Sequence, residues 1–513
     1  MVGQHATGNY TSSRLSILHR SFARIFDILI DYAYTIPPVF LIIVTYPYWG
    51  QTPALDPMIM YRQSTILFHG GILPTIRDAP FIHPPLLFLV NAVAFFFFGN
   101  SPTTYNGVGL AALLVASYTL YRTLRDIWNK HLAALATLLL FCNPQVIINS
   151  FYLNYDMVIL VFLVFVLRTY ILGKRWVFAL VCAAMVTLKE TALAIPLAFF
   201  LYSSVAIGFH RVAFRTKVHA ISQNSLIYLP TLLLFLIWQG ILQGVGASEW
   251  RAHIFEETQM SSYMLTLTNV ITLKIFNQYF LQNIFNTFGL NFQWILTVDT
   301  LILWIVYKYR RFAQTDKQKR FIHTLLWISV TYGLLALTFP TWTIPRYGIP
   351  LLLCLVFFFS LFVLATPRIL KILFIAEVIA LTIVANVSSL DPLSRALGTT
   401  YIRGEEFYAN DIDPNGPDGL FYNTQILHPI TKQNALVRFA SEQHADILIA
   451  NCDELKLAER IESAFSFPSA YPQYALTQPL ACVSAVADPE WDLLRGYTVV
   501  LDRPNDKPVV LSL

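Results

Sequence analysis

Long apolar runs alternate with short polar segments over most of this chain. A helix needs about 20 apolar residues to cross a bilayer. The candidate spans are 27–48, 104–121, 132–149, 156–172, 175–188, 191–209, 226–245, 291–307, 322–339, 348–366 and 369–388. The pattern therefore predicts an all-α polytopic membrane domain of about 11 transmembrane helices over residues 27–390, preceded by a cytoplasmic segment 1–26.

Two further apolar stretches are predicted to lie along the membrane surface. The segment Pro84–Gly99 is apolar but short, and counting it as a span would invert the orientation of every later loop. It is therefore predicted to lie in, or dip into, the outer interface. The long segment 246–290 ends in an amphiphilic stretch rich in Phe, Leu, Asn and Tyr, which predicts a second interfacial helix.

The composition changes from Ser389 onward, where Asp, Asn, Gly and Pro predominate. We interpret 391–430 as a linker and 431–513 as a small soluble α/β domain. Its predicted helices are 432–443 and 453–464, and its predicted strands are Asp446–Ala450 and Thr498–Asp502. If this domain is extracytoplasmic, Cys452 and Cys482 either form a disulfide or stay reduced, and the spacing alone does not decide between the two.

Charge supports a membrane protein and sets its orientation. Charged residues make up only 13% of the chain, against about 25% in a soluble domain, and the net charge is +5. Before position 400, twenty of 27 basic residues fall in six clusters between apolar runs: Arg14/Arg20/Arg24, Arg122/Arg125/Lys130, Arg168/Lys174/Arg175, Arg211/Arg215/Lys217, Lys308–Arg320 and Arg368/Lys371. By the positive-inside rule these clusters mark the cytoplasmic face. The basic excess therefore does not indicate nucleic-acid binding.

The remaining loops, predicted to face outward, carry the residues capable of chemistry. Asp56 follows the first span and is either a general base or a helix N-cap before Pro57. Asp156 begins a later span, where it either caps the helix or binds a sugar or cation. Lys189 and Glu190 occupy a short hairpin turn and either pair with each other or bind substrate. Charges at such a position are costly and indicate function.

Three further outward segments carry candidate ligands. Arg346 and Tyr347 open a late span, and Arg can hold a phosphate with two hydrogen bonds or anchor the helix at the interface. A turn-rich stretch contains Arg77, Asp78 and His83, and His83 precedes a double proline that can start a helix. His83 either binds a metal or phosphate or is an interfacial histidine. The long 246–290 segment adds His253 and Glu256.

Five motifs in this order resemble the GT-C superfamily of membrane glycosyltransferases. They are the first-loop Asp, a GG-x-LP-x-x-RD…HPPL stretch, an N-x-D opening a later span, an LKE hairpin turn and an RY-x-x-P opening a late span. None is specific alone. The match covers residues 25–390 and is most similar to the dolichyl-phosphate-mannose protein mannosyltransferase and lipid A aminoarabinose transferase branch.

The resemblance implies a polyprenyl-phosphate-linked sugar as donor and a lipid, glycan or protein acceptor. It implies that Asp56 is the base, that Asp156 orients substrate or binds a cation, and that Lys189 and Arg346 approach the donor phosphate. His83, Glu190, Arg77 and Tyr347 are further substrate-binding candidates. The chain has Pro57 and Ile82 where the family often has acidic residues, so a divalent cation stays an open possibility, with Asp56, Asp78 and His253 as candidate ligands.

The implied mechanism is an inverting transfer at the outer face of a membrane, expected to be a bacterial inner membrane. Cations would stabilise the departing lipid phosphate while Asp56 takes the acceptor proton. A transporter or flippase of lipid-linked saccharides is an alternative, although such proteins usually place charges near the midplane and show inverted repeats. An inactive scaffold is a third, because of Pro57 and Ile82. The sugar and the acceptor are not set by the sequence.

Overall fold

The computed structural model describes most of residues 27–394 and three short strands beyond them. The described residues are 27–46, 49, 55–71, 84–209, 214–244, 272, 280–290, 292–307, 315–337, 345–387, 393–394, 447–448, 498–501 and 509–511. The N-terminal segment 1–26, the proposed linker 391–430 apart from residues 393–394, and the predicted helices 432–443 and 453–464 lie outside them.

The described membrane domain is built of helices, including three short 3-10 helices labelled η. In chain order they are η1 (Ala33–Thr35), α2 (Ile36–Thr45), α3 (Leu55–Gly70), α5 (Leu86–Phe98), α6 (Pro102–Ile127), α7 (Lys130–Phe141), α8 (Pro144–Phe151), α9 (Tyr155–Ile171), α10 (Arg175–Val186), η3 (Glu190–Leu193), α11 (Ala194–Phe209), α12 (Phe214–Gly244), α15 (Phe280–Phe288), α16 (Gln293–Tyr307), α17 (Asp316–Leu337), η6 (Pro345–Gly348), α18 (Ile349–Ala365) and α19 (Arg368–Val387).

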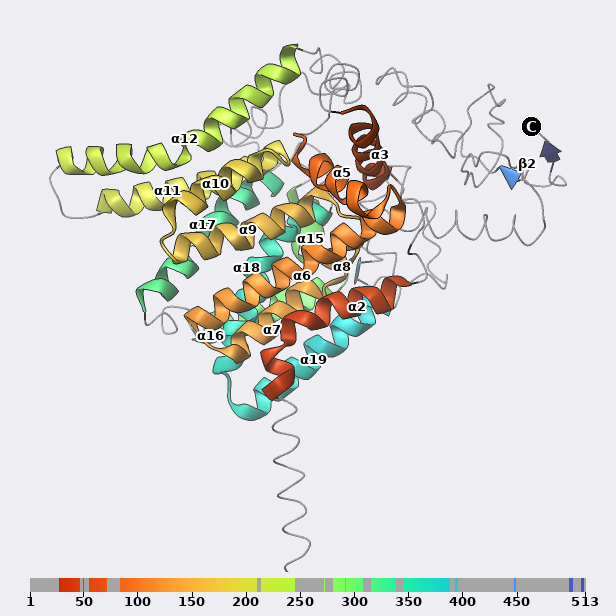
Figure 1. Cartoon of the computed structure of the whole chain (residues 1–513). Coiled ribbons are helices and arrows are strands. Elements are labelled where there is room, and N and C mark those ends of the chain that lie inside the picture. Colours follow the sequence, from red (N-terminus) through yellow and green to blue (C-terminus); the bar gives the residue numbers. More distant parts are fainter. Residues whose placement is uncertain are drawn as a thin grey trace, which may run out of the picture.

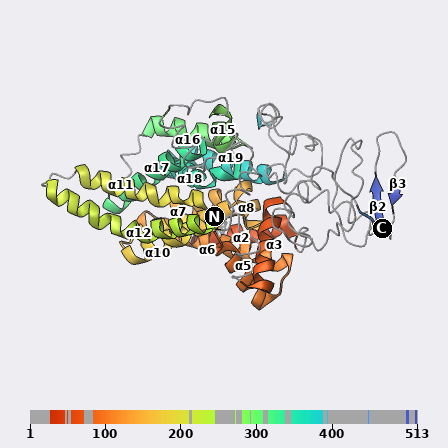
Figure 2. The same cartoon turned by 90° about the horizontal axis from the view of Figure 1, so that it is seen from above.

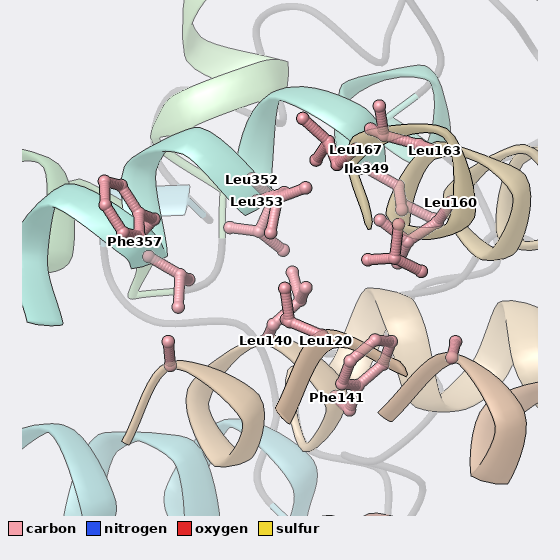
Figure 3. Close-up of a cluster of buried hydrophobic side chains, with 14 of the residues drawn as sticks. Leu120, Leu140, Phe141, Leu160, Leu163, Leu167, Ile349, Leu352, Leu353 and Phe357 are labelled. Atoms are coloured by element: carbon pink, nitrogen blue, oxygen red, sulfur yellow. The ribbon is translucent and has the colours of Figure 1, made fainter. Parts of the chain in front are cut away.

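These helices pack side by side into a bundle with two distinct ends (Figures 1 and 2). In both views α3 and α5 lie at one end, and α11 and α12 project at the opposite end. The centre is formed by α6, α7, α9 and α18, whose inward side chains meet in one apolar cluster (Figure 3). Among them Leu120, Leu163 and Phe357 are fully or almost fully buried.

One close helix approach explains a glycine. Gly109 of α6 lies against the backbone at the end of α8, where an added Cβ would overlap the carbonyl oxygen of Ser150. A larger side chain there would push α6 away from α8. Gly107, on the same helix, faces open space. The small residue at 109 therefore sets how closely α8 packs on α6.

The candidate span 132–149 is broken, which corrects the prediction of one continuous helix. The pair α7 and α8 bends by 65° at Cys142 and Asn143. The Asn143 side chain accepts a hydrogen bond from the backbone N–H of Gln145 at 3.0 Å and so caps the new helix, whose first residue is Pro144. Across the break, Asn386 Nδ2 donates to the Cys142 carbonyl at 2.9 Å. Polar side chains thus satisfy the backbone groups that the bend releases.

The described helices identify an integral membrane protein. By length and composition four of them can cross a membrane, namely Pro102–Ile127, Thr191–Gly208, Phe214–Ile241 and Arg368–Asn386, and the bent pair could be a fifth. The other candidate spans also coincide with described helices, although several are short or carry charges. The number of eleven spans stays a prediction, as does the interfacial position of α5 and α15.

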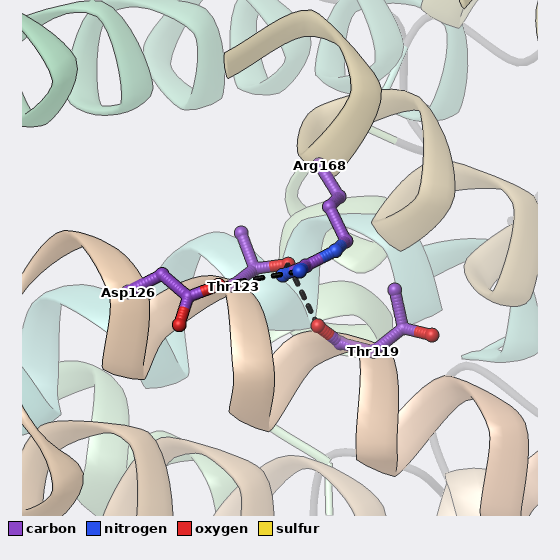
Figure 4. A network of polar contacts seen from close by, with 4 residues as sticks. All are labelled: Thr119, Thr123, Asp126 and Arg168. Carbon is purple, nitrogen blue, oxygen red and sulfur yellow. Dashed lines mark hydrogen bonds and ion pairs between the residues drawn. The ribbon is translucent and has the colours of Figure 1, made fainter. Parts of the chain in front are cut away.

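The C-terminal end of α9 carries a partly exposed polar network (Figure 4). Arg168 donates to the Asp126 carboxylate at 3.2 Å and to the Thr123 hydroxyl at 3.4 Å. Lys130 pairs with Asp27 at 2.9 Å. Three of the basic residues predicted to be cytoplasmic lie at helix ends. Arg125 and Arg168 are in the last turns of α6 and α9, and Lys130 is the first residue of α7.

The described C-terminal residues form three strands. The sheet has the order β1 (Ile447–Leu448), β2 (Thr498–Leu501), β3 (Val509–Leu511). The middle strand β2 is parallel to β1 and antiparallel to β3. The first two strands fall within the predicted strand segments. A soluble α/β domain at 431–513 stays a prediction.

Candidate functional site

The most unusual feature of the bundle is a buried ion pair between Lys189 and Asp156. The Lys189 Nζ lies 3.2 Å from Oδ1 and 3.4 Å from Oδ2 of Asp156. The side chains are 8% and 0% exposed. A deeply buried ion pair loses more hydration energy than a surface pair, so it contributes little net stability to the fold. Both residues were candidates from the sequence, and the structure brings them together.

Asp156 is positioned by the start of α9. The helix begins at Tyr155, and its N-cap is Asn154, which makes no side-chain capping hydrogen bond. The interpretation of Asp156 as the N-cap is therefore wrong, because the residue lies inside the first turn. A carboxylate there is favoured by the helix dipole. The preceding Leu153 has a φ of 43°, which is uncommon for a branched residue, so the chain enters α9 through a sharp turn.

Lys189 is positioned by the predicted hairpin turn. After α10 the chain turns at Thr187, and Lys189 is the N-cap residue of η3 with extended backbone. The Leu86 amide donates to the Thr187 carbonyl at 3.1 Å. The start of α5, directly after the double proline, is therefore fixed beside this turn.

An aromatic ring completes the described site. The Lys189 Nζ lies 4.3 Å from the centroid of the Tyr347 ring, which is a cation–π contact. Tyr347 lies on η6, which joins the site to the late span α18. Tyr332 of α17 is 2% exposed, and α17 packs against both α9 and η6. Four elements (α9, η3, η6 and α17) therefore converge on one charged centre.

The other candidate residues are only partly placed, or not placed. Asp56 is the second residue of α3, which packs against α5, but its side chain is not described. The same holds for the side chains of Glu190 in η3 and Arg346 in η6, the latter adjacent to Tyr347. The positions outside the described residues are Arg77, Asp78, His83, His253 and Glu256. The alternative pairing of Lys189 with Glu190 is therefore untested, whereas its pairing with Asp156 is observed.

The described residues contain no group of three or more His, Cys, Asp or Glu side chains able to hold a metal. Asp78 and His253, two of the candidate ligands, are not among those residues, so a divalent cation stays a prediction. The cysteines Cys142, Cys182 and Cys354 are free thiols within the bundle. Cys452 and Cys482 lie outside the described part of the chain.

The two ends of α9 differ in chemistry. Asp156 and Arg168 are twelve residues apart, which corresponds to about 18 Å along a helix. The ion pair of Asp156 at the first end is buried. At the second end, the side chains of Arg168 and its partner Asp126 are 25% and 37% exposed. The buried pair and the partly exposed network therefore lie at opposite ends of α9, and the assignment of these ends to two faces of a membrane stays a prediction.

Sequence reasoning missed a set of buried amides beside this site. Every residue of α8 is buried, including Gln145 and Asn149. Within the described part of the chain, Gln145 Nε2, Asn149 Oδ1 and Asn154 Nδ2 have no hydrogen-bond partner. The signal was the dipeptide Asn143-Pro144, which marks turns and could have revealed the break inside an apolar run.

No protein-family profile matches the sequence, and no curated protein is similar to it in sequence. Solved structures similar in fold include the oligosaccharyltransferase AglB from Archaeoglobus fulgidus in complex with an inhibitory peptide and a dolichol-phosphate, at 15% identity and a TM-score of 0.45, covering 77% of this chain and 59% of that chain. They also include ArnT from Cupriavidus metallidurans, in the apo state (12% identity, TM-score 0.49) and bound to undecaprenyl phosphate (11%, 0.46), each covering 82% of this chain and 73% of that chain.

At 11–15% identity, these likenesses concern the fold alone. This chain spans little more than half the length of AglB. The assignment of an activity therefore rests on the residues of the site itself.

Proposed function

We propose that this protein is an integral-membrane glycosyltransferase that moves a sugar from a polyprenyl-phosphate donor to an acceptor at the extracytoplasmic face. The observation that carries the proposal is the buried Lys189–Asp156 pair under the Tyr347 ring. A fixed cation next to a helix N-terminus suits a phosphate at headgroup depth, since both favour negative charge.

The order of the motifs supports the same proposal. The pair joins the N-x-D and LKE motifs, Tyr347 adds the RY motif, and the bond between Leu86 and Thr187 brings the end of the HPPL stretch beside them. Residues far apart in the chain, each singled out for one activity, thus converge on one place. Chance packing of the helices would not be expected to bring residues of these motifs together.

The proposed reaction is a single displacement at the anomeric carbon. The bond between that carbon and the donor phosphate oxygen breaks, and a bond to the acceptor hydroxyl or amine forms on the opposite face, with inversion. Asp56 takes the acceptor proton. The leaving lipid phosphate keeps the electron pair, and Lys189 with Arg346 stabilises its charge. Asp156 holds the Lys189 ammonium in place and Tyr347 covers it.

The test is transfer of radiolabelled sugar from a panel of polyprenyl-phosphate sugars by the purified protein in lipid. Asp56→Asn should abolish transfer without unfolding the protein. Asp316→Asn is a matched control, because Asp316 is an exposed carboxylate, 97% exposed, at the far end of α17. Turnover by Asp56→Asn at the wild-type rate would remove Asp56 as the base.

A transporter or flippase of lipid-linked saccharides is the second candidate, and the 65° break between α7 and α8 favours it. Transporters often bind substrate at broken helices. The two candidates differ in product. Movement of an intact donor across vesicles, with no release of lipid phosphate, would support the transporter and contradict the transferase.

A further inference from the structure

The second polar centre of the bundle is the amide cluster, by which we mean Gln145, Asn149 and Asn154. Their exposed fractions are 4%, 4% and 1%. Burying an amide group without a hydrogen bond is costly, so native proteins seldom leave one without a protein or water partner. Three such groups lie within ten residues, on α8 and at the N-cap of α9, and each needs a hydrogen-bond partner other than the described protein atoms.

The amide cluster is built on the same elements as the ion pair. The backbone N–H of Asn154 donates to the backbone carbonyl of Asn149 at 2.9 Å, and Asn154 is the N-cap of the helix that carries Asp156 in its first turn. The helix α8, which carries Gln145 and Asn149, packs against η6, which carries Tyr347. The cluster is therefore adjacent to both α9 and η6, the elements that hold Asp156 and the ring above Lys189.

The local fold makes the cluster rigid. Asn149 Nδ2 donates to the Gln145 carbonyl at 2.7 Å, so the Asn149 side chain is held on the helix surface. The Asn143 cap and the Asn386 bond fix the break that precedes α8. Gly109 lets α6 pack closely on the end of α8. A preorganised set of polar groups loses little entropy on binding a ligand.

The unpaired atoms define the chemistry of the ligand. Two are donors, Gln145 Nε2 and Asn154 Nδ2, and one is an acceptor, Asn149 Oδ1. An anion can accept from the two donors but gives nothing to the acceptor, and a metal cation matches only the acceptor. A hydroxyl group both donates and accepts. The set therefore suits an uncharged polyhydroxyl group.

We propose that the amide cluster binds the glycosyl group of the donor, so that Gln145 and Asn149 help to select the sugar while Lys189 holds the phosphate. This inference rests on the proposed function, since it names the sugar subsite of the same centre. It assigns a binding role to a bent helix that the sequence motifs do not include. Ordered water filling the same place is the competing explanation.

The experiment compares binding of a sugar-bearing polyprenyl phosphate with binding of the same lipid phosphate without sugar, using the full chain in lipid nanodiscs. The variants are Gln145→Met and Asn149→Leu, which keep side-chain size and remove the polar atoms. Thr137→Val is the matched control, because Thr137 lies on α7, is fully buried and also has an unpartnered oxygen within the described residues. Thermal unfolding confirms that each variant is folded.

We expect each cluster variant to lose about 3- to 10-fold in affinity for the sugar-bearing lipid, the value of one hydrogen bond. The affinity for the sugar-free lipid phosphate should stay unchanged, and Thr137→Val should match the wild type with both lipids. If the cluster variants bind both lipids like the wild type, the amides hold only water and this inference is wrong. If the wild type binds neither lipid, the proposed function fails as well.

Discussion

The buried ion pair predicts a specific pattern of stability among variants. Lys189→Met leaves the Asp156 carboxylate, which is 0% exposed, without this cation. Breaking a buried pair by removing one partner costs about 3–5 kcal/mol. The N-terminus of α9 compensates part of this cost, by about 1 kcal/mol, and the lost contact with Tyr347 adds about 1 kcal/mol. We therefore expect a loss of about 3–5 kcal/mol.

The double variant Asp156→Leu/Lys189→Met removes both charges and should recover most of that loss, because an apolar replacement of a buried pair is often neutral or stabilising. The matched control is Arg168→Met on the same helix. Its pair with Asp126 is partly exposed, so its removal should cost at most about 1 kcal/mol.

The assay is thermal unfolding of the purified variants in one detergent, followed by intrinsic fluorescence. The predicted order of stability is wild type and the double variant highest, Arg168→Met close to them, and Lys189→Met clearly lowest. The reasoning is refuted if Lys189→Met is as stable as Arg168→Met, or if the double variant is less stable than Lys189→Met.

Three further predictions concern the frame around the site. Tyr347→Leu should lower the free energy of unfolding by about 0.5–2 kcal/mol, because the ring over Lys189 is lost. Tyr347→Phe keeps the ring and should keep most of that stability. An equal loss in both variants would assign the effect to the hydroxyl group. Gly109→Ala should destabilise the protein by about 1–3 kcal/mol, because the new methyl group would overlap the Ser150 carbonyl. Gly107→Ala is the control, because an added methyl group there meets no atom and should not destabilise the protein. Similar melting temperatures for the two variants would disprove the close approach. Asn386→Leu should cost about 1–3 kcal/mol, because the Cys142 carbonyl at the break of α7 loses its partner; an unchanged denaturation midpoint would mean that the break needs no such bond.

The helices of the membrane domain could be predicted because apolar runs are a local property of the chain. The Thr187–Thr191 turn was found in the same way, and η3 begins within it. The described strands β1 and β2 lie within the predicted segments 446–450 and 498–502, which were also found from local composition, whereas the domain boundary near Ser389 stays a prediction. The bend at Asn143 was missed because the run 132–149 is apolar on average, and the average hides a capping Asn and a Pro.

The partners within the site could not be predicted in the same way. The sequence left open whether Lys189 pairs with Glu190 or binds substrate, and it gave no sign that the Lys189 ammonium contacts a carboxylate 33 residues earlier. Capping was one of two alternatives for Asp156, and Asn154 is the N-cap residue instead. Such pairings depend on how α9, η3 and η6 pack. Periodicity shows only which face of each element is apolar.

The most direct test of the central claim is the binding of sugar-free polyprenyl phosphate to the purified protein in nanodiscs. The wild type is compared with the Asp156→Leu/Lys189→Met variant, which the stability argument predicts to be folded. Because charge-assisted hydrogen bonds to phosphate are strong, we expect the variant to bind on the order of tenfold more weakly or worse. Equal affinity of the two proteins would show that the buried pair does not hold the lipid phosphate, and would contradict the account.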